Sequence, residues 1–224
     1  KFVARWNGSV WEPFDNGAER GLYALAEFNG SLVAAGPAYS NTHLAIYRHN
    51  GATWQQMGSD LVGANFGVTT VWCFGNYGGT LYAGGAFFQP GACLVKWGGT
   101  DWISAGHYFG SGYDQTAYML AQYRDRLLVS GRGLRYPGVT SGYGGIGIFD
   151  GANWSGLGNG SYNCEIWAST VFRGDLILGG TMFYSGPTIF ISRFGCPTCN
   201  GDLNYDDLVD DSDFIEFIAS YDSL

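Results

Sequence analysis

The chain repeats four times a pattern that first occurs as Tyr23-Ala-Leu-Ala-Glu-Phe-Asn-Gly-Ser-Leu-Val-Ala-Ala-Gly36. The other copies are residues 72–85, 118–131 and 167–180, and all four align without gaps. Each copy opens on an aromatic residue, with a second aromatic, a leucine and a glycine following at fixed distances. The copies start 46 or 49 residues apart, and a fixed period of this length is the mark of a repeat architecture.

The recurring positions are an opening aromatic (Tyr23, Trp72, Tyr118, Trp167), a second aromatic (Phe28, Tyr77, Tyr123, Phe172), a leucine (Leu32, Leu81, Leu127, Leu176) and a glycine (Gly36, Gly85, Gly131, Gly180). We expect both aromatics and the leucine to fill the space between neighbouring sheets. Glycine at the end of a strand indicates a close backbone approach or a bulge.

Each unit is expected to form four short strands, in the first unit over residues 23–28, 32–36 and 44–48 and around Trp54. Asn29-Gly30 separates the first two strands, and a turn of the form Asn/Asp/Gly-Gly-x-x-Trp precedes the fourth. Asn-Gly and Asp-Gly dipeptides between apolar runs predict type I′ turns, in which both central residues have positive φ. Four-stranded units at this spacing are typical of a β-propeller. Residues 1–195 are therefore predicted to be an all-β propeller with about four to five blades' worth of repeats.

The composition agrees with short strands joined by tight turns. Aromatic residues make up 17% of the 224 residues, charged residues only 13%, and 37 residues are glycine. An apolar share of 46% excludes a disordered chain, and glycines without a three-residue period exclude a collagen. The uncharged stretch 61–95 is broken by eight glycines and a proline, so no membrane span is predicted.

The negative charge lies at one end of the chain. Eight of the 19 acidic side chains, and none of the 11 Lys and Arg side chains, fall in residues 196–224, so the net charge of −8 arises there. Such a segment repels phosphate backbones, and nucleic acid is not expected as a partner. Concentrated carboxylates instead indicate a cation.

The same segment, 196–224, carries the sharpest chemical motif. Oxygen donors fall at positions 1, 3, 5, 7, 9 and 12 of a twelve-residue loop, as Asp202, Asn204, Asp206, Leu208, Asp210 and Asp213. Leu208 would contribute its backbone carbonyl, and Asp210 can act through a water molecule. A hard cation such as Ca²⁺ takes roughly six to eight oxygen ligands, so this spacing predicts a calcium site. Apolar residues at 214, 217, 218 and 221 predict a short helix after the loop.

Catalytic groups are sparse in the repeats. The histidines are His43, His49 and His107, for which exposed loop positions are the simpler interpretation. Carboxylates for glycoside cleavage would come from Glu12, Asp15, Glu19, Glu27, Asp60, Asp101, Asp114, Asp125, Asp150, Glu165 and Asp175. Asp150 and Asp175 already occupy turn positions. Tyr136 and Tyr143, expected to be exposed in a glycine-rich loop, are candidates for stacking on sugar rings.

The chain has five cysteines, Cys73, Cys93, Cys164, Cys196 and Cys199. A second C-x-x-C pair for zinc is missing, and no βαβ pattern supports a redox role. In an exported protein one or two disulfides are the natural use of cysteine. Cys73 and Cys93, on neighbouring strands of one unit, are one candidate pair.

The repeat resembles kelch-like and galactose-oxidase-like propellers of secreted bacterial proteins through its Asn-Gly-x-Leu and Asn-Gly-x-x-Trp turns. The acidic loop, with aspartate at its twelfth position, resembles the calcium loops of type I dockerins, although only one copy is present and Asp207 stands where glycine is expected. Cys-x-x-Cys followed by this loop resembles the tails of secreted planctomycete-type proteins. These resemblances imply an exported or cell-surface location, Ca²⁺ as the bound ion, and a cohesin-like protein or a cell-envelope component as partner of the tail. Because the chain begins at Lys1, in the middle of a repeat, it is expected to be a processed or truncated piece.

Two functions are consistent with this sequence. The first is a non-enzymatic binding module, in which the propeller takes a glycan or protein ligand and residues 196–224 attach it to a partner. The second is a carbohydrate-active enzyme, a hydrolase, lyase or oxidase, with its catalytic residues in the central channel. Propellers host both classes, so the fold alone does not decide between them.

Overall fold

The computed structural model describes residues 3–15, 21–38, 43–63, 69–106, 115–136, 145–156, 163–172, 174–183 and 189–194. Over these residues the chain is all-β, and its strands pair antiparallel. The predicted calcium loop, the helix after it and the domain boundary at residue 195 lie outside the described residues. In the described ranges, no helix has the length and apolar character to cross a membrane.

Strands that follow one another in the chain pair into four successive sheets, which we call blades. Blade 1 consists of β3 (Ala24–Phe28), β4 (Ser31–Ala35), β6 (Tyr47–His49) and β7 (Trp54–Gln56). Blade 2 consists of β9 (Thr70–Tyr77), β10 (Thr80–Ala86), β11 (Leu94–Trp97) and β12 (Trp102–Ser104). Blade 3 consists of β13 (Thr116–Tyr123), β14 (Arg126–Arg132), β15 (Gly145–Phe149) and β16 (Trp154–Gly156). Blade 4 has three described strands, β17 (Asn163–Phe172), β18 (Asp175–Phe183) and β19 (Ile189–Phe194).

Two shorter strand pairs accompany the blades. A hairpin of β1 (Ala4–Trp6) and β2 (Trp11–Pro13) precedes blade 1. In the connections around blade 1, β5 (His43–Leu44) pairs with β8 (Leu61–Val62).

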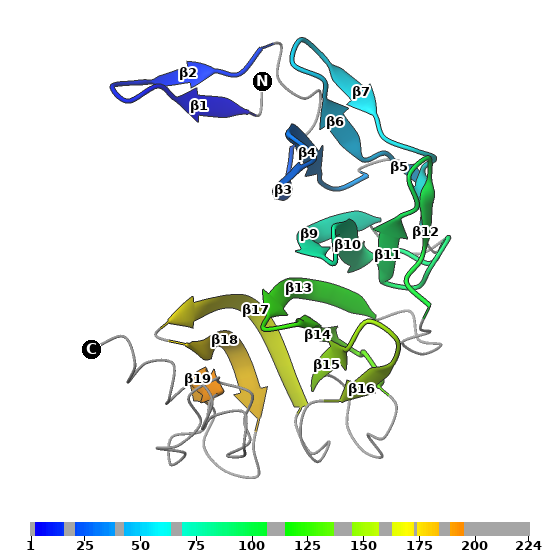
Figure 1. Cartoon of the computed structure of the whole chain (residues 1–224), viewed down its shortest axis with the longest axis vertical. Helices are drawn as coiled ribbons and strands as arrows, with labels where there is room; N and C mark the ends of the chain where they lie inside the picture. The colour runs from blue at the N-terminus through cyan, green and yellow to red at the C-terminus, as the bar shows by residue number, and fades with distance from the viewer. Residues whose placement is uncertain are drawn as a thin grey trace, which may run out of the picture.

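The blades follow one another along an arc, with their first strands on the concave side and their last strands on the convex side (Figure 1). We call the first strands β3, β9, β13 and β17 the inner strands; each contacts the next one along the arc. Three hydrophobic clusters lie between blades 1 and 2, 2 and 3, and 3 and 4. Sheets that bury their faces only against their neighbours in this radial order form the predicted β-propeller architecture.

Two classes of hairpin turn were predicted to be type I′. The turn between the first two strands of blade 1 has this conformation, and the turns before the fourth strands do not. Between β3 and β4, Asn29 and Gly30 have φ of 49° and 70°, so the predicted type I′ turn is confirmed. The Asn/Asp/Gly-Gly-x-x-Trp segments were wrongly expected to be the same turn. They are four-residue loops in which the glycine alone has positive φ, at 97–102° in Gly8, Gly51, Gly99 and Gly151.

Three of the four loops are held by a side-chain cap. Their first residue accepts, with its side-chain oxygen, the backbone N–H groups two and three residues on, which are donors that a two-residue turn would not have. The pairs are Asn7 with Ser9 and Val10, Asn50 with Ala52 and Thr53, and Asp150 with Ala152 and Asn153. These N–H donors, first that of Asn153, lower the pKa of Asp150. The loop of blade 2 begins with Gly98 and has the same length without a cap.

Candidate ligand-binding site

In blades 2, 3 and 4 the opening aromatic stands at a β-bulge of its inner strand, whereas Tyr23 immediately precedes β3. In blade 3, Ala117 pairs with Gly131 and Met119 with Ser130, so Tyr118 has no partner on β14. In the same way Trp72 is the extra residue of β9 and Trp167 that of β17. A bulge inserts one residue into a strand and re-aims its side chain. The same bulge thus recurs in blades 2, 3 and 4.

The recurring glycine is the residue opposite the bulge. A Cβ atom at Gly36, Gly85, Gly131 or Gly180 would lie 2.2, 2.0, 1.9 or 2.1 Å from the carbonyl oxygen of Gly21, Thr70, Thr116 or Glu165, respectively. That carbonyl belongs in every case to the residue two before the opening aromatic. The backbones approach so closely that no side chain fits, which confirms the predicted close approach. Blade 1 has the same close approach, between Gly36 and the carbonyl of Gly21.

The bulges turn the opening aromatics to the surface. Tyr23 is 49% exposed, Trp72 40% and Trp167 59%, and Tyr118 is half-buried. The expectation that these residues fill the space between sheets is thus wrong for the opening aromatic. It is confirmed for the leucines, since Leu81, Leu127 and Leu176 are fully buried and Leu32 is half-buried. The bulge is the cause, because it breaks the strict alternation of side chains along the inner strand.

The four rings contact one another from blade to blade, and we call Tyr23, Trp72, Tyr118 and Trp167 the aromatic ladder. Tyr23 and Trp72 are stacked, with ring centroids 4.8 Å apart and planes 18° apart. Trp72 and Tyr118 meet edge to face at 6.0 Å and 69°. Tyr118 and Trp167 do the same at 6.5 Å and 83°. Trp72, Tyr118 and Trp167 belong to the inner strands, which line the concave side of the arc (Figure 1), and Tyr23 immediately precedes β3. The ring contacts therefore link four blades.

One pair of charges stands at the blade 4 end of the ladder. Glu165 and Trp167 flank the buried Ile166 on β17, and Trp167 is 59% exposed. Arg132, the last residue of β14 in blade 3, places its Nε 3.8 Å from Oε1 of Glu165. The side chains of Arg132 and Glu165 are 57% and 32% exposed, so both heads reach water.

The second aromatic has the predicted packing role in the first three repeats, in which Phe28 and Tyr123 are buried and Tyr77 is half-buried; the prediction is wrong for Phe172 of the fourth repeat, which is 59% exposed. Tyr77 donates its hydroxyl hydrogen to the carbonyl of Asp125, and Tyr123 donates to the carbonyl of Gly174, both in the first hairpin of the next blade. The tryptophan of the fourth strand points to the preceding blade. Trp102 donates its Nε1–H to the carbonyl of Met57, and Trp154 donates to that of Ala105. These repeated bonds join the blades and leave the side chains no free surface for a ligand.

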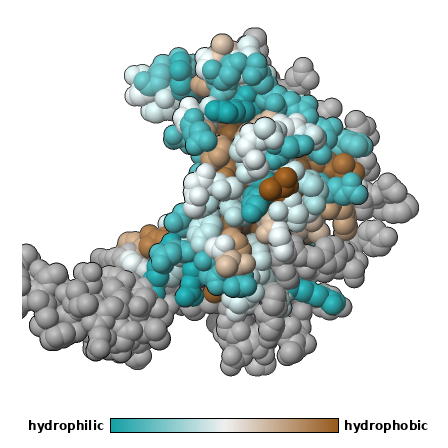
Figure 2. Space-filling model, turned by 45° about the vertical axis from the view of Figure 1, so that its right-hand side comes forward, coloured by the Kyte–Doolittle hydropathy of each residue, from teal (hydrophilic) through white to brown (hydrophobic). Residues whose placement is uncertain are grey.

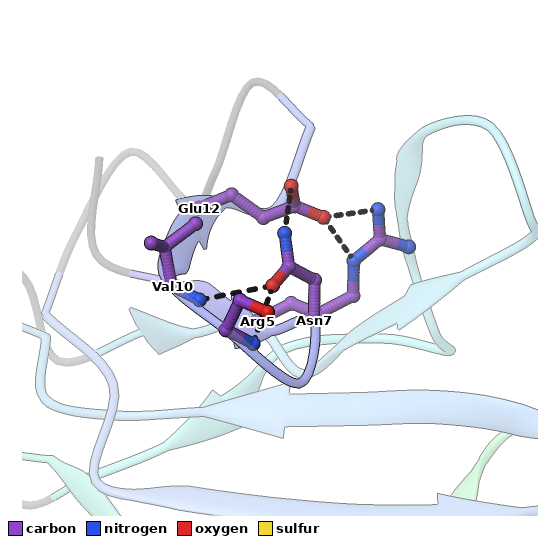
Figure 3. Close-up of polar contacts among 5 residues, drawn as sticks. Arg5, Asn7, Val10 and Glu12 are labelled. Atoms are coloured by element: carbon purple, nitrogen blue, oxygen red, sulfur yellow. Dashed lines mark hydrogen bonds and ion pairs between the residues drawn. The ribbon is translucent and has the colours of Figure 1, made fainter.

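Polar side chains on the outer hairpins are also engaged in structure. In the β1–β2 hairpin, Arg5 bonds Oε1 of Glu12 through Nε at 2.9 Å and Nη2 at 2.6 Å, and Asn7 donates to Oε2 (Figure 3). The hydrogen bond from Arg5 is the main reason that the pKa of Glu12 is lowered. Asp101 accepts the backbone N–H groups of Ser59 and Trp102, which lower its pKa. These carboxylates join strands and loops of the scaffold.

The histidines named from the sequence fall into different surroundings. His49 is buried beside Phe14 and Trp54 and bonds Asp15, so the expectation of an exposed loop position is wrong for it. The backbone N–H of Gly51 donates to His49 Nδ1, which makes Nε2 the donor to Asp15. His43 is exposed, 3.9 Å from a carboxylate oxygen of Asp60. His107 lies outside the described residues.

Tyr136 and Tyr143 are the two tyrosines that the sequence suggests for stacking on sugar rings. Tyr136, expected to be exposed for sugar stacking, is buried, donates to the carbonyl of Val129 and packs where Gly147 leaves room, so that expectation is wrong. Tyr143 lies outside the described residues. On the face seen in Figure 2, hydrophobic residues form small separate patches among neutral and hydrophilic ones.

The cysteines whose side chains are described form no disulfide. Cys73 and Cys93 are free thiols, and burial raises the pKa of each to about 12. The proposed Cys73–Cys93 pair is therefore wrong. In both cases the apolar surroundings disfavour the thiolate, so neither is a reactive nucleophile.

The predicted calcium ligands Asp202, Asn204, Asp206, Leu208, Asp210 and Asp213 all lie outside the described residues. Within the described ranges, no three His, Cys, Asp or Glu side chains gather as the ligands of a metal ion would. The calcium site therefore stays a prediction from the sequence.

No family model matches the chain, and no curated protein matches it. Among solved structures it is similar to the computationally designed Ika4 protein, with 15% identity, 81% of this chain and 96% of that chain covered, and a TM-score of 0.44. It is also similar to an acylaminoacyl peptidase from Pyrococcus horikoshii, with 9% identity, 75% of this chain and 26% of that chain covered, and a TM-score of 0.42. Similarities this remote say nothing about ligand or activity.

Proposed function

We propose that the protein is a non-enzymatic binding module, secreted or displayed at the cell surface, whose propeller takes a glycan or protein ligand on the aromatic ladder. The observation that carries the proposal is the exposure of Tyr23, Trp72 and Trp167 at equivalent positions. Exposed Trp and Tyr side chains combine a large apolar ring with a polar tip, and they are enriched where proteins bind ligands and partners.

The scaffold itself does not need these rings at the surface. Packing between blades is supplied by the leucines and by the second aromatics, of which Phe28 and Tyr123 are buried. Opening aromatics that contact each other in a continuous row instead form an extended, rigid surface. Such a surface binds at low cost in side-chain entropy, because an aromatic ring has only two side-chain torsions to fix.

The C-terminal segment is proposed as the attachment element. Its support is the spacing of Asp202, Asn204 and Asp206 with the later donors, and the resemblance of this loop to the calcium loops of type I dockerins. In the proposal Ca²⁺ stabilises the loop, and a cohesin-like protein or a cell-envelope component binds it. The kelch-like and galactose-oxidase-like turns of the repeats support an exported protein, the setting in which such tails occur.

The ligand site is tested with the whole chain on an array of glycans and on immobilised polysaccharides. We expect binding by the natural sequence, and its loss in a Trp72→Ala/Trp167→Ala double variant. Trp11→Ala is the matched control, since Trp11 is an exposed tryptophan outside the ladder, 69% exposed on β2. Reducing-sugar release from the same polysaccharides detects the enzyme alternative; release that survives in the double variant would show that the ladder is not the functional site.

The tail is tested separately, by calorimetric titration of the whole chain with Ca²⁺. We expect saturable binding that Asp202→Ala/Asp206→Ala abolishes and that Asp150→Ala leaves intact, because Asp150 caps a loop in blade 3. Equal heats for the natural sequence and the Asp202→Ala/Asp206→Ala variant would remove the calcium part of the proposal and leave the ladder untouched.

A further inference from the structure

We infer that the blade 4 end of the aromatic ladder recognises a neutral carbohydrate chain, with one sugar ring against Trp167 and its hydroxyl groups bonded to Arg132 and Glu165. The inference rests on the proposed function, because it assigns the ligand class and the polar contacts of the same surface. It is argued from the ring geometry, from the position of the ion pair and from the way the four repeats differ.

Ring geometry favours Trp167 as the stacking surface. Tyr23 and Trp72 are closed against each other, since their planes are 18° apart at 4.8 Å and no ring fits between them. Trp167 has the largest exposed fraction in the ladder, 59%, and it meets Tyr118 nearly at right angles, at 83°. An open indole offers a flat apolar surface of the size of a sugar ring, and the C–H groups of a pyranose face pack on it.

The ion pair joins the same two blades as the contact between Tyr118 and Trp167. Glu165 precedes Trp167 by two residues on the same inner strand, with buried Ile166 between them. Arg132 reaches Glu165 from blade 3, in the strand β14 that pairs with the strand of Tyr118, so the pair crosses the seam between blades 3 and 4. A ring ligand on Trp167 would therefore have charged hydrogen-bonding groups at its rim.

The fold does not require these two charges. The positions equivalent to Glu165 in the other repeats are Gly21, Thr70 and Thr116, and the positions equivalent to Arg132 are Pro37, Ala86 and Thr181. All four copies form the same close approach of the glycine to the opposite carbonyl, with or without a charge at either place. Since the bulge forms equally well without the pair, its presence at one seam points to recognition and not to folding.

The chemistry of the pair selects the ligand class. At 3.8 Å the Arg132 Nε and the Glu165 oxygen are too far apart for a good hydrogen bond, so the guanidinium and carboxylate keep capacity for other partners. Neighbouring sugar hydroxyls both donate and accept, and they can satisfy both groups together. An apolar peptide laid on Trp167 would desolvate the pair without such partners, which is unfavourable. The pair sums to zero charge, which favours a neutral ligand over an anionic one.

The experiment is native affinity electrophoresis of the whole chain through gels that contain hydroxyethylcellulose, xylan, glucomannan or dextran. Polygalacturonate is the anionic comparison, and an immobilised Leu- and Phe-rich peptide is the apolar one. We expect retardation by at least one neutral polysaccharide. We expect the apparent affinity to fall about tenfold or more in Trp167→Ala, and about tenfold in Glu165→Thr and in Arg132→Thr, in which the position takes the residue type of another repeat.

The controls separate a contact with ligand from damage to the fold. Glu12→Thr removes an ion pair on the β1–β2 hairpin, where Arg5 and Glu12 lie 2.6 Å apart, and it should bind like the natural sequence. Glu165→Gln keeps an acceptor and should recover part of the affinity lost in Glu165→Thr. Equal urea midpoints for all these variants establish that the fold is intact.

Each outcome decides one level of the assignment. If Glu165→Thr and Arg132→Thr bind as tightly as the natural sequence while Trp167→Ala loses binding, the polar recognition is wrong and the proposed function stands. Retention by the peptide alone overturns the carbohydrate class and keeps a binding module. Preference for polygalacturonate overturns the neutral ligand. Retention by none of the probes overturns the inference, and the glycan array then decides the proposed function on its own.

Discussion

The two aromatic positions of each inner strand lie five residues apart and have opposite roles. In blade 3, Tyr118 belongs to the exposed row of rings, while Tyr123 is buried and donates a 2.9 Å hydrogen bond to the next blade. Both residues are tyrosines on β13, so residue type does not explain the difference. Their odd separation already places the two side chains on opposite faces of a regular strand, and the bulge at Tyr118 then re-aims that ring.

This comparison shows how one repeat supplies both a scaffold and a surface. The second aromatic and the leucine recur because each blade must bury its faces against its neighbours. The opening aromatics contact one another from blade to blade, yet Tyr23, Trp72 and Trp167 remain 40–59% exposed. Substitutions at the two positions should therefore affect different properties, and the following changes test that separation.

The largest loss of stability is expected when a seam leucine is truncated. Leu127 is fully buried between blades 2 and 3, so Leu127→Ala leaves a cavity and should cost about 3 kcal/mol. Leu25→Ala is the matched control, because Leu25 is 55% exposed on β3 and its truncation should cost less than about 0.5 kcal/mol. Urea unfolding followed by tryptophan fluorescence measures both. Equal shifts of the midpoint would contradict a core located between blades.

The next effect concerns the glycine opposite the bulge. In Gly180→Ala the new Cβ would lie 2.1 Å from the carbonyl oxygen of Glu165, so the strands must separate at a cost of about 2 to 3 kcal/mol. In Gly179→Ala the nearest atoms are 3.9 Å away, and the variant should unfold at nearly the natural urea concentration. These neighbours on β18 differ by one position only. A tolerant Gly180→Ala would show that the bulge does not depend on glycine.

Much of the fold could be predicted from the sequence because its signals are local. The Asn29-Gly30 turn requires positive φ at two adjacent residues, which few residue types allow, and the structure has that turn. The loop at Asn50 could not be recognised by the same rule. There the asparagine side chain caps a four-residue loop, and a dipeptide does not show the length of the loop that contains it.

The ladder was not predicted, although a signal for it was present. Glycine at the end of the second strand indicated a bulge, and Gly85 does lie against the carbonyl of Thr70. The sequence alone does not show which residue of the facing strand is the extra one. Trp72 was therefore assigned to the core, since a recurring aromatic is usually buried. Register is a property of two strands together, and it is fixed only when they pair.

A smaller loss of stability is expected when the hydroxyl group of the second aromatic is removed, and none when that of an opening aromatic is removed. Tyr123→Phe removes the hydrogen bond to Gly174 and should cost about 1 kcal/mol, because the carbonyl in the seam loses its donor. Tyr23→Phe removes a hydroxyl from an exposed ladder ring and should leave the urea midpoint unchanged. If the two variants lose the same stability, the hydroxyl of the second aromatic is not part of the seam.

The smallest effect on stability is expected for Trp167→Ala, which should change the free energy of unfolding by no more than about 0.5 kcal/mol. The side chain is largely exposed and lies outside the buried cluster between blades 3 and 4, so its removal opens no cavity. Trp154→Ala is the contrasting variant, because Trp154 is buried and bonds the carbonyl of Ala105 in blade 2; it should cost about 3 kcal/mol or more. A Trp167→Ala variant as unstable as Trp154→Ala would mean that the blades need the ladder to hold together, and its effect on binding would then no longer identify a contact with ligand.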